Sequence, residues 1–154
     1  MHLFPAFVKL GGRRVVVVGG GSVATSKLNG LQNAGAQITV VAPDVTADIQ
    51  TADVTVLRRP FRDTDLDGAW LAVAAATPSV NREVARAGEA RQIFVNAVDD
   101  PPNASLYLGG VVRRAGVTFA ISTDGSVLQD DDSGFGGYAF ALYSNVKSNP
   151  YLTK

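Results

Sequence analysis

The fold is decided by one short stretch, which reads Arg14-Val15-Val16-Val17-Val18-Gly19-Gly20-Gly21-Ser22-Val23-Ala24. Its four consecutive valines are typical of a parallel strand that is buried on both faces. The glycines predict a tight turn, and residues 22–34 have the apolar spacing of a helix, which Gly35 ends. A second strand is expected over residues 37–41. Together these features predict a βαβ unit.

Strand-like and helix-like segments continue to alternate after this unit. Further strands are expected over residues 54–57, 71–75 and 93–98, and a helix over residues 78–90, where Pro78 suits the first turn. Strands that are separated by helices predict an α/β fold with a doubly wound, Rossmann-type parallel sheet. Trp70 directly precedes one of the buried strands, so we expect it in the core.

The last part of the chain has a different character. Two strand-like segments, residues 111–113 and 117–122, flank Ala115-Gly116 and predict a β-hairpin. Beyond Gly125 no stretch has helical periodicity, and the acidic, glycine-rich residues 130–137 predict no regular element. We therefore expect a dinucleotide-binding domain over residues 1–110 and a smaller region over residues 111–154.

Composition excludes several classes of function. Fourteen lysines and arginines balance fourteen aspartates and glutamates, so no net charge favours nucleic acid or an anionic membrane as a partner. No apolar run approaches the roughly 20 residues that a membrane-spanning helix needs, and the N-terminus lacks the pattern of a signal peptide. The chain has no cysteine and a single histidine, His2, which excludes disulfides, cysteine nucleophiles and multi-histidine metal sites. We expect no metal site and a cytoplasmic protein.

The glycine turn matches the pattern Gly-x-Gly-x-x-Ala at Gly19, Gly21 and Ala24. In a dinucleotide-binding turn the first glycine permits the tight bend and the second lets the backbone approach a pyrophosphate. The alanine then lets the helix pack closely on the strand. A purely structural turn is the alternative interpretation, and the strand–turn–helix–strand context favours dinucleotide binding.

One feature of a dinucleotide site is displaced. The acidic residue that binds the ribose hydroxyls is expected at the end of the second strand, about 20 residues after the turn. That place holds Ala42-Pro43, with Asp44 just beyond. Asp44 or backbone groups could bind the ribose. Since no arginine stands there to receive a 2′-phosphate, the sequence favours NAD over NADP.

Six segments between residue 3 and about residue 125 occur in a characteristic order: Phe4-Pro5 with 8–10, 17–24 with Lys27, 38–43, 74–77 with Val80-Asn81, 94–101, and 119–125. In this order the chain resembles the precorrin-2 dehydrogenase family, which includes the N-terminal module of siroheme synthase. That family ends its second strand as Ala42-Pro43 does here and still uses NAD.

The resemblance implies a function and a set of site residues. The family oxidises precorrin-2 to sirohydrochlorin with NAD⁺ in siroheme biosynthesis, and some members also insert ferrous iron. It implies a homodimer that acts on a small tetrapyrrole, with Asp99 as the catalytic residue. The cofactor-binding positions are Gly19, Gly21, Ser22, Val23, Ala24, Ala42, Pro43, Thr77, Asn96 and Val98. Thr123 matches a position near the tetrapyrrole, and Arg113 is a candidate partner for the substrate's carboxylates.

Other interpretations of the same residues stay open. Residues 99–103 could form only a solvated turn, with Asp100 the clearer case, and Asn81 and Asn96 could serve only to satisfy backbone groups. After Gly125 the chain departs from the family, which continues with a long helical dimerisation segment. A truncation, an altered C-terminal sequence or a degenerate copy would each explain this. The alternative functions are a non-catalytic dinucleotide-binding or sensing module and a chelatase without dehydrogenase activity.

Overall fold

The computed structural model describes residues 3–98, 100–114 and 117–121. The chain divides into two compact units. The larger unit is Pro5–Leu106. The smaller unit takes its described residues from Leu3, Phe4 and the segment that begins at Tyr107. No helix within the described ranges is both long enough and apolar enough to span a membrane.

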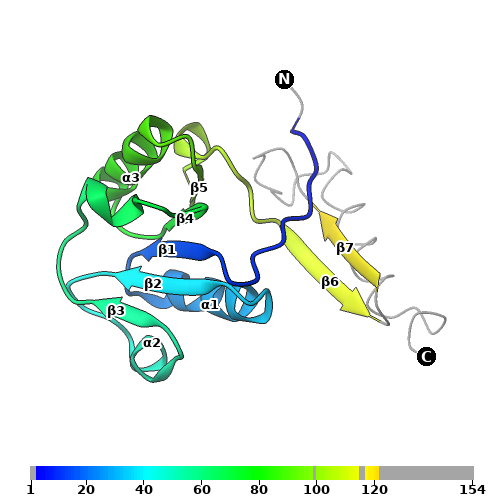
Figure 1. Cartoon of the computed structure of the whole chain (residues 1–154), viewed down its shortest axis with the longest axis horizontal. Helices are drawn as coiled ribbons and strands as arrows, with labels where there is room; N and C mark the ends of the chain where they lie inside the picture. Colours follow the sequence, from blue (N-terminus) through cyan, green and yellow to red (C-terminus); the bar gives the residue numbers. More distant parts are fainter. Residues whose placement is uncertain (1–2, 99, 115–116, 122–154) are drawn as a thin grey trace, which may run out of the picture. The chain divides into compact units, whose positions relative to one another are not determined.

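The larger unit is built on a five-stranded parallel sheet, which confirms the expected α/β, Rossmann-type fold (Figure 1). The strand order is β3-β2-β1-β4-β5, so the chain winds outward from β1 in both directions. The strands are β1 (Arg14–Val18), β2 (Gln37–Val41), β3 (Thr55–Leu57), β4 (Leu71–Ala74) and β5 (Phe94–Ala97). The helices are α1 (Ser22–Asn33), α2 (Ala47–Thr51) and α3 (Pro78–Ala90), with 3₁₀ turns η1 (Asp63–Leu66) and η2 (Pro101–Asn103).

The valines of β1 explain why the sheet is covered on both faces. Successive side chains of a strand point to opposite sides, so Val15 and Val17 pack in one apolar cluster with Leu28 of α1. Val16 and Val18 pack in a second cluster with Val84 of α3. All four valines are at most 2% exposed. The prediction of a strand that is buried on both faces is therefore confirmed.

Helix α1 ends as its sequence predicts. Gly35 has a φ of +74°, a left-handed conformation that favours glycine. Its N–H donates to the Gln32 carbonyl at 2.8 Å, and the Ala36 N–H donates to the Leu31 carbonyl at 3.1 Å. This pair of bonds is a Schellman motif, which satisfies carbonyl groups at the end of the helix.

Helix α2 and the environment of Trp70 differ from the sequence-based expectation. The short helix α2 was not expected, because five residues are too few for a helical period to show in the sequence. The expectation that Trp70 lies in the core is wrong, since this residue is 52% exposed. The Arg13 guanidinium carbon lies 3.4 Å from the centre of the Trp70 ring, so a cation–π contact takes the place of burial.

The smaller unit contains the predicted β-hairpin. Strand β6 (Gly110–Arg114) pairs antiparallel with β7 (Val117–Ile121), and Val112 lies opposite Phe119. Apolar side chains of the hairpin, such as Val111 and Phe119, are 42% and 38% exposed. The predictions for the segment after Gly125 lie outside the described residues.

Candidate cofactor site

The candidate site lies at the carboxyl edge of the parallel sheet, where the strand order reverses. The chain leaves β1 toward β2 on one side, while β4 pairs with β1 on the other side. Such a switch point opens a crevice in which doubly wound proteins bind ligands. The turn after β1 is held there by two bonds, from the Gly19 N–H to the Val41 carbonyl at 3.0 Å and from the Ala75 N–H to the Val18 carbonyl at 2.8 Å.

The first two glycines of the turn are required by the protein's own packing. Gly19 has a φ of +124°, and a Cβ on it would lie 2.2 Å from the Ala75 carbonyl oxygen. A Cβ on Gly20 would lie 1.9 Å from the carbonyl oxygen of Asp44. Gly19 therefore permits the bend, as expected. Gly20 allows the turn after β2 to approach, a role that the sequence pattern did not reveal.

The third glycine faces open space and begins helix α1. No atom lies within 4 Å of a Cβ built on Gly21. Gly21 is the N-cap residue, and among the described residues no side chain caps this helix and no acidic residue stands in its first turn. The first N–H groups of a helix have no partner within it, and its dipole favours an anion at that end. The turn therefore fits the pyrophosphate of a dinucleotide.

The remaining residues of the predicted turn are divided between the ligand side and the core. Ser22 is exposed and Val23 is 41% exposed, so both are accessible beside the helix start. Ala24 is fully buried in the cluster that contains Val17. Ala24 therefore does what the sequence pattern predicts for a small residue at this position, which is to bring α1 close to the sheet.

The turn after β2 brings the displaced acidic residue next to the glycine turn. Ala42 is 4% exposed, and its N–H donates to the Leu57 carbonyl at 3.2 Å. Pro43 and Asp44 are exposed, and the Asp44 backbone contacts Gly20. In this fold the turn after the second strand faces the adenosine ribose. Pro43 and Asp44 can therefore contact a ligand there with their side chains, whereas Ala42 offers chiefly its backbone.

The positions expected on the nicotinamide side lie at the ends of β4 and β5. Thr77 is the exposed N-cap residue of α3, and its hydroxyl lies 3.1 Å from that of Ser79. The Val98 N–H donates to the Ala74 carbonyl at 3.0 Å, which ties the chain after β5 to β4. Both residues thus lie at the same edge of the sheet as the glycine turn.

The two buried asparagines have different partners. The Asn81 Oδ1 accepts a hydrogen bond from the Ala76 N–H at 3.0 Å, so Asn81 satisfies a backbone group. The Asn96 Nδ2 donates to the Leu106 carbonyl at 3.0 Å. Its Oδ1 is the buried side-chain oxygen for which the described residues supply no partner. Asn96 therefore retains an unused acceptor near the carboxyl end of β5.

Of the predicted catalytic and substrate residues, only Arg113 lies within the described part of the chain. Asp99 and Thr123 lie outside the described residues. Arg113 is exposed on β6, in the smaller unit. Asp100 acts in a turn, because its carboxylate accepts from the Asn103 Nδ2 at 2.9 Å and its carbonyl accepts from the Asn103 N–H at 3.1 Å. The turn interpretation thus holds for Asp100.

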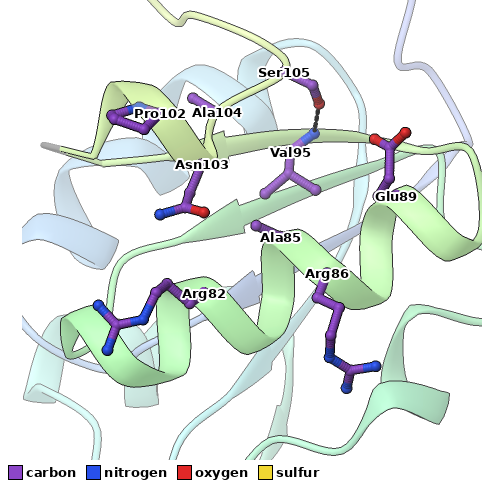
Figure 2. A pocket seen from close by; sticks show the side chains of 9 residues that line it. All are labelled: Arg82, Ala85, Arg86, Glu89, Val95, Pro102, Asn103, Ala104 and Ser105. Carbon is purple, nitrogen blue, oxygen red and sulfur yellow. Dashed lines mark hydrogen bonds between the residues drawn. The ribbon is translucent and has the colours of Figure 1, made fainter.

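A separate groove lies between α3 and η2 and has a volume of about 300 Å³ (Figure 2). None of the residues predicted for the cofactor or the substrate lines it in the described part of the chain. Arg86 pairs with Asp63 at 2.8 Å, and its guanidinium points away from Val95 in Figure 2. The Ser105 hydroxyl accepts from the Val95 N–H at 2.9 Å.

Over the described ranges, no cluster of three or more histidine, cysteine, aspartate or glutamate side chains could hold an ion.

Comparison with known proteins agrees with this geometry. Residues 6–110 match the family described as "Putative NAD(P)-binding". The siroheme synthases of Salmonella typhi and of Escherichia coli O139:H28 (strain E24377A / ETEC) are each 38% identical to this chain over 131 residues, which are 82% of this chain and 29% of theirs. The chain thus spans less than a third of the length of these relatives.

Among solved structures, SirC, a precorrin-2 dehydrogenase, matches with a TM-score of 0.69 and 28% identity, over 92% of this chain and 78% of SirC. These matches confirm the family that was expected from the sequence. The chain is similar to siroheme synthases and to a precorrin-2 dehydrogenase, and it belongs to the NAD(P)-binding family that residues 6–110 match.

Proposed function

We propose that this chain is an NAD-dependent precorrin-2 dehydrogenase, which oxidises precorrin-2 to sirohydrochlorin in siroheme biosynthesis. One observation carries the proposal. The uncapped start of α1 lies at the switch point of the sheet, in a chain that is similar over 92% of its length to SirC, a precorrin-2 dehydrogenase. The N–H groups at Gly21, Ser22 and Val23 would bind the pyrophosphate.

The oxidation removes two hydrogens from the tetrapyrrole, one as a hydride and one as a proton. NAD⁺, when bound, supplies the hydride acceptor. The chain has to orient the macrocycle and accept the proton. Asp99 comes shortly after the end of β5 in the sequence, and the carboxyl ends of parallel strands meet at one edge. We assign the proton to the Asp99 carboxylate, and Thr77 and Val98 to the nicotinamide side.

The substrate and a second subunit involve the smaller unit. We assign residues 1–110 to the Rossmann domain and residues 111–154 to the hairpin and the dimerisation region. The exposed Arg113 would bind a carboxylate of the tetrapyrrole, with Thr123 close to the macrocycle. A two-stranded hairpin is marginally stable by itself, and Val111 and Phe119 of this hairpin are exposed. This supports a homodimer in which the second copy covers these side chains. We also propose that the protein is cytoplasmic, since a chain without cysteine suits a reducing compartment.

The test is NADH formation from precorrin-2 and NAD⁺ by the folded protein. Replacement of Asp99 by Asn should slow turnover by about 10²-fold or more, the usual contribution of a catalytic acid or base, and leave NADH binding unchanged. Asp100→Asn is the matched control and should retain most of the activity, because Asp100 serves the turn. Binding of NADH without turnover would instead favour the non-catalytic module, and ferrous iron insertion without NADH formation would favour the chelatase.

A further inference from the structure

Two threonines that the sequence motifs did not single out connect the two turns of the cofactor site. Thr25 lies in α1, just after the glycine turn, and Thr46 is the N-cap residue of α2. Their Oγ1 atoms are 2.8 Å apart and partly buried. The residues are 21 positions apart in the sequence, so this contact depends on how the βαβ unit folds.

The two hydroxyls belong to a directed chain of hydrogen bonds. The Thr25 hydroxyl donates to the Gly21 carbonyl at 3.0 Å. Because a hydroxyl carries a single proton, the Thr46 hydroxyl has to donate to Thr25 Oγ1. Thr46 Oγ1 in turn accepts from the Ile49 N–H at 3.4 Å. The three hydrogen bonds therefore all run in one direction, from the Ile49 N–H through the two hydroxyls to the Gly21 carbonyl.

The backbone holds the same two turns together. The Thr46 N–H donates to the Gly20 carbonyl at 2.9 Å, and the Asp44 carbonyl oxygen lies against the α-carbon of Gly20. One turn faces the pyrophosphate of a dinucleotide and the other faces its adenosine ribose. A ligand that touches both turns therefore depends on the distance between them.

We propose that Thr25 and Thr46 are positioning residues, whose hydroxyl pair sets the spacing of the two turns and thereby the affinity for the whole dinucleotide. The inference rests on the proposed function, because it takes the glycine turn as the cofactor site. Neither threonine contacts the reacting atoms. Loss of the pair therefore raises the KM for NAD⁺ and leaves kcat unchanged.

The experiment compares hydroxyl-deleting and hydroxyl-preserving variants. Thr46→Val removes the bridge and keeps the size of the side chain, while Thr46→Ser keeps the hydroxyl. NADH titration should give about tenfold weaker binding for Thr46→Val, the effect of losing one hydrogen bond, and near-normal binding for Thr46→Ser. Thr25→Val should behave like Thr46→Val, and the double variant should bind no more weakly than Thr25→Val, because both changes break one chain.

A control and a second ligand separate positioning from general destabilisation. Ser26→Ala removes another α1 hydroxyl, which bonds to the Val23 carbonyl at 2.7 Å, and should leave the Kd for NADH unchanged. Adenosine touches only the turn after β2, so its Kd should not change in Thr46→Val. ADP-ribose touches both turns, so it should bind more weakly. All titrations are made where circular dichroism shows each variant fully folded.

The possible failures are distinct. Wild-type protein that binds no NADH contradicts the proposed function. Wild-type binding that Thr46→Val and Thr25→Val leave unchanged overturns the inference and leaves the proposed function intact. An equal loss of affinity for adenosine and ADP-ribose also overturns it, because a change in spacing cannot weaken a ligand that touches one turn.

Discussion

The carbonyl oxygen of Asp44 occupies the space in which a side chain on Gly20 would stand, since a Cβ there would be 1.9 Å away. The next glycine of the same turn is the opposite case, because a Cβ on Gly21 meets no atom within 4 Å. Two adjacent glycines therefore have different purposes. Gly20 is required by the packing of the protein, and Gly21 leaves room for a ligand.

This difference predicts separate effects on stability and on binding. Gly20→Ala should lower the free energy of unfolding by about 1–3 kcal/mol or more, because a backbone carbonyl has to move. Gly21→Ala should lower it by less than about 1 kcal/mol, the cost of a poorer N-cap residue. The Gly21 variant should still bind NADH at least about tenfold more weakly, because a methyl group would stand beside the helix N–H groups. Urea unfolding and NADH titration measure the two effects.

Gly30→Ala provides the control for these variants. Gly30 lies in the exposed part of α1, and a Cβ on it meets no atom within 4 Å. Alanine is the better helix residue, so this change should stabilise the protein by about 0.5–1 kcal/mol and leave NADH binding unaltered. Equal destabilisation by Gly20→Ala and Gly21→Ala would contradict the assignment of the two glycines.

The exposed carboxylate of Asp44 predicts a preference for the cofactor without a 2′-phosphate. Repulsion between this charge and a 2′-phosphate at a solvent-exposed site is on the order of 1 kcal/mol, or about fivefold in Kd. Asp44→Asn should therefore narrow the ratio of the Kd values for NADPH and NADH by about that factor. Asp53→Asn removes an exposed carboxylate outside the site and should leave the ratio unchanged. A preference that survives Asp44→Asn in full would show that other groups select the cofactor.

The sequence was sufficient for those parts of the fold that depend on local pattern. The valines of β1, the glycine turn and the stop at Gly35 are each determined by neighbours in the chain, and the boundaries of β1 and β2 agree with the expectation. The pattern could not give the contacts between distant segments. Gly20 against Asp44, and Thr25 against Thr46, arise only when α1 and α2 fold onto the same edge of the sheet.

The candidate site was predictable to a similar degree. The glycine motif predicted the uncapped helix start at which we propose that the pyrophosphate binds, because that chemistry needs small residues and free N–H groups at fixed offsets. The environment of Trp70, in contrast, could not be predicted from its neighbours in the sequence. Its neighbours in β4 are buried, yet the Arg13 guanidinium covers its ring and the residue remains 52% exposed. A single sequence does not show which side chain will reach a ring across 57 positions.

The two buried asparagines should respond differently to the same substitution. Asn81 uses its Oδ1 as an acceptor near the start of α3, so Asn81→Asp keeps the bond and places a negative charge where the helix dipole favours it. Asn96 uses its Nδ2 as a donor to the Leu106 carbonyl. Both changes bury a carboxylate, since Asn81 and Asn96 are 4% and 7% exposed. Only Asn96→Asp also puts two acceptors in contact, so it should cost about 2–4 kcal/mol more than Asn81→Asp. Chemical unfolding at neutral pH measures the loss of stability in each variant. Equal losses would contradict the assignment of different hydrogen-bond partners to the two side chains.

The ion pair of Arg59 and Asp65 predicts a loss of stability in acid. The Arg59 guanidinium hydrogen-bonds the Asp65 carboxylate at 2.8 Å and holds the pKa of Asp65 below its usual range. The Arg62 N–H lowers the pKa of Asp65 further, and burial opposes both effects. A lowered pKa stabilises the folded state above the ordinary aspartate pKa of about 3.9, and this contribution is lost as the pH falls through the folded value. Stability should therefore decline below about pH 5.

Asp65→Asn should cost about 1–3 kcal/mol at pH 7 and flatten this decline. Asp63→Asn breaks the exposed pair with Arg86, should cost at most about 1 kcal/mol and should keep the decline. Urea unfolding followed by the fluorescence of Trp70, the single tryptophan, measures these curves, and an unchanged slope in Asp65→Asn would contradict the assignment.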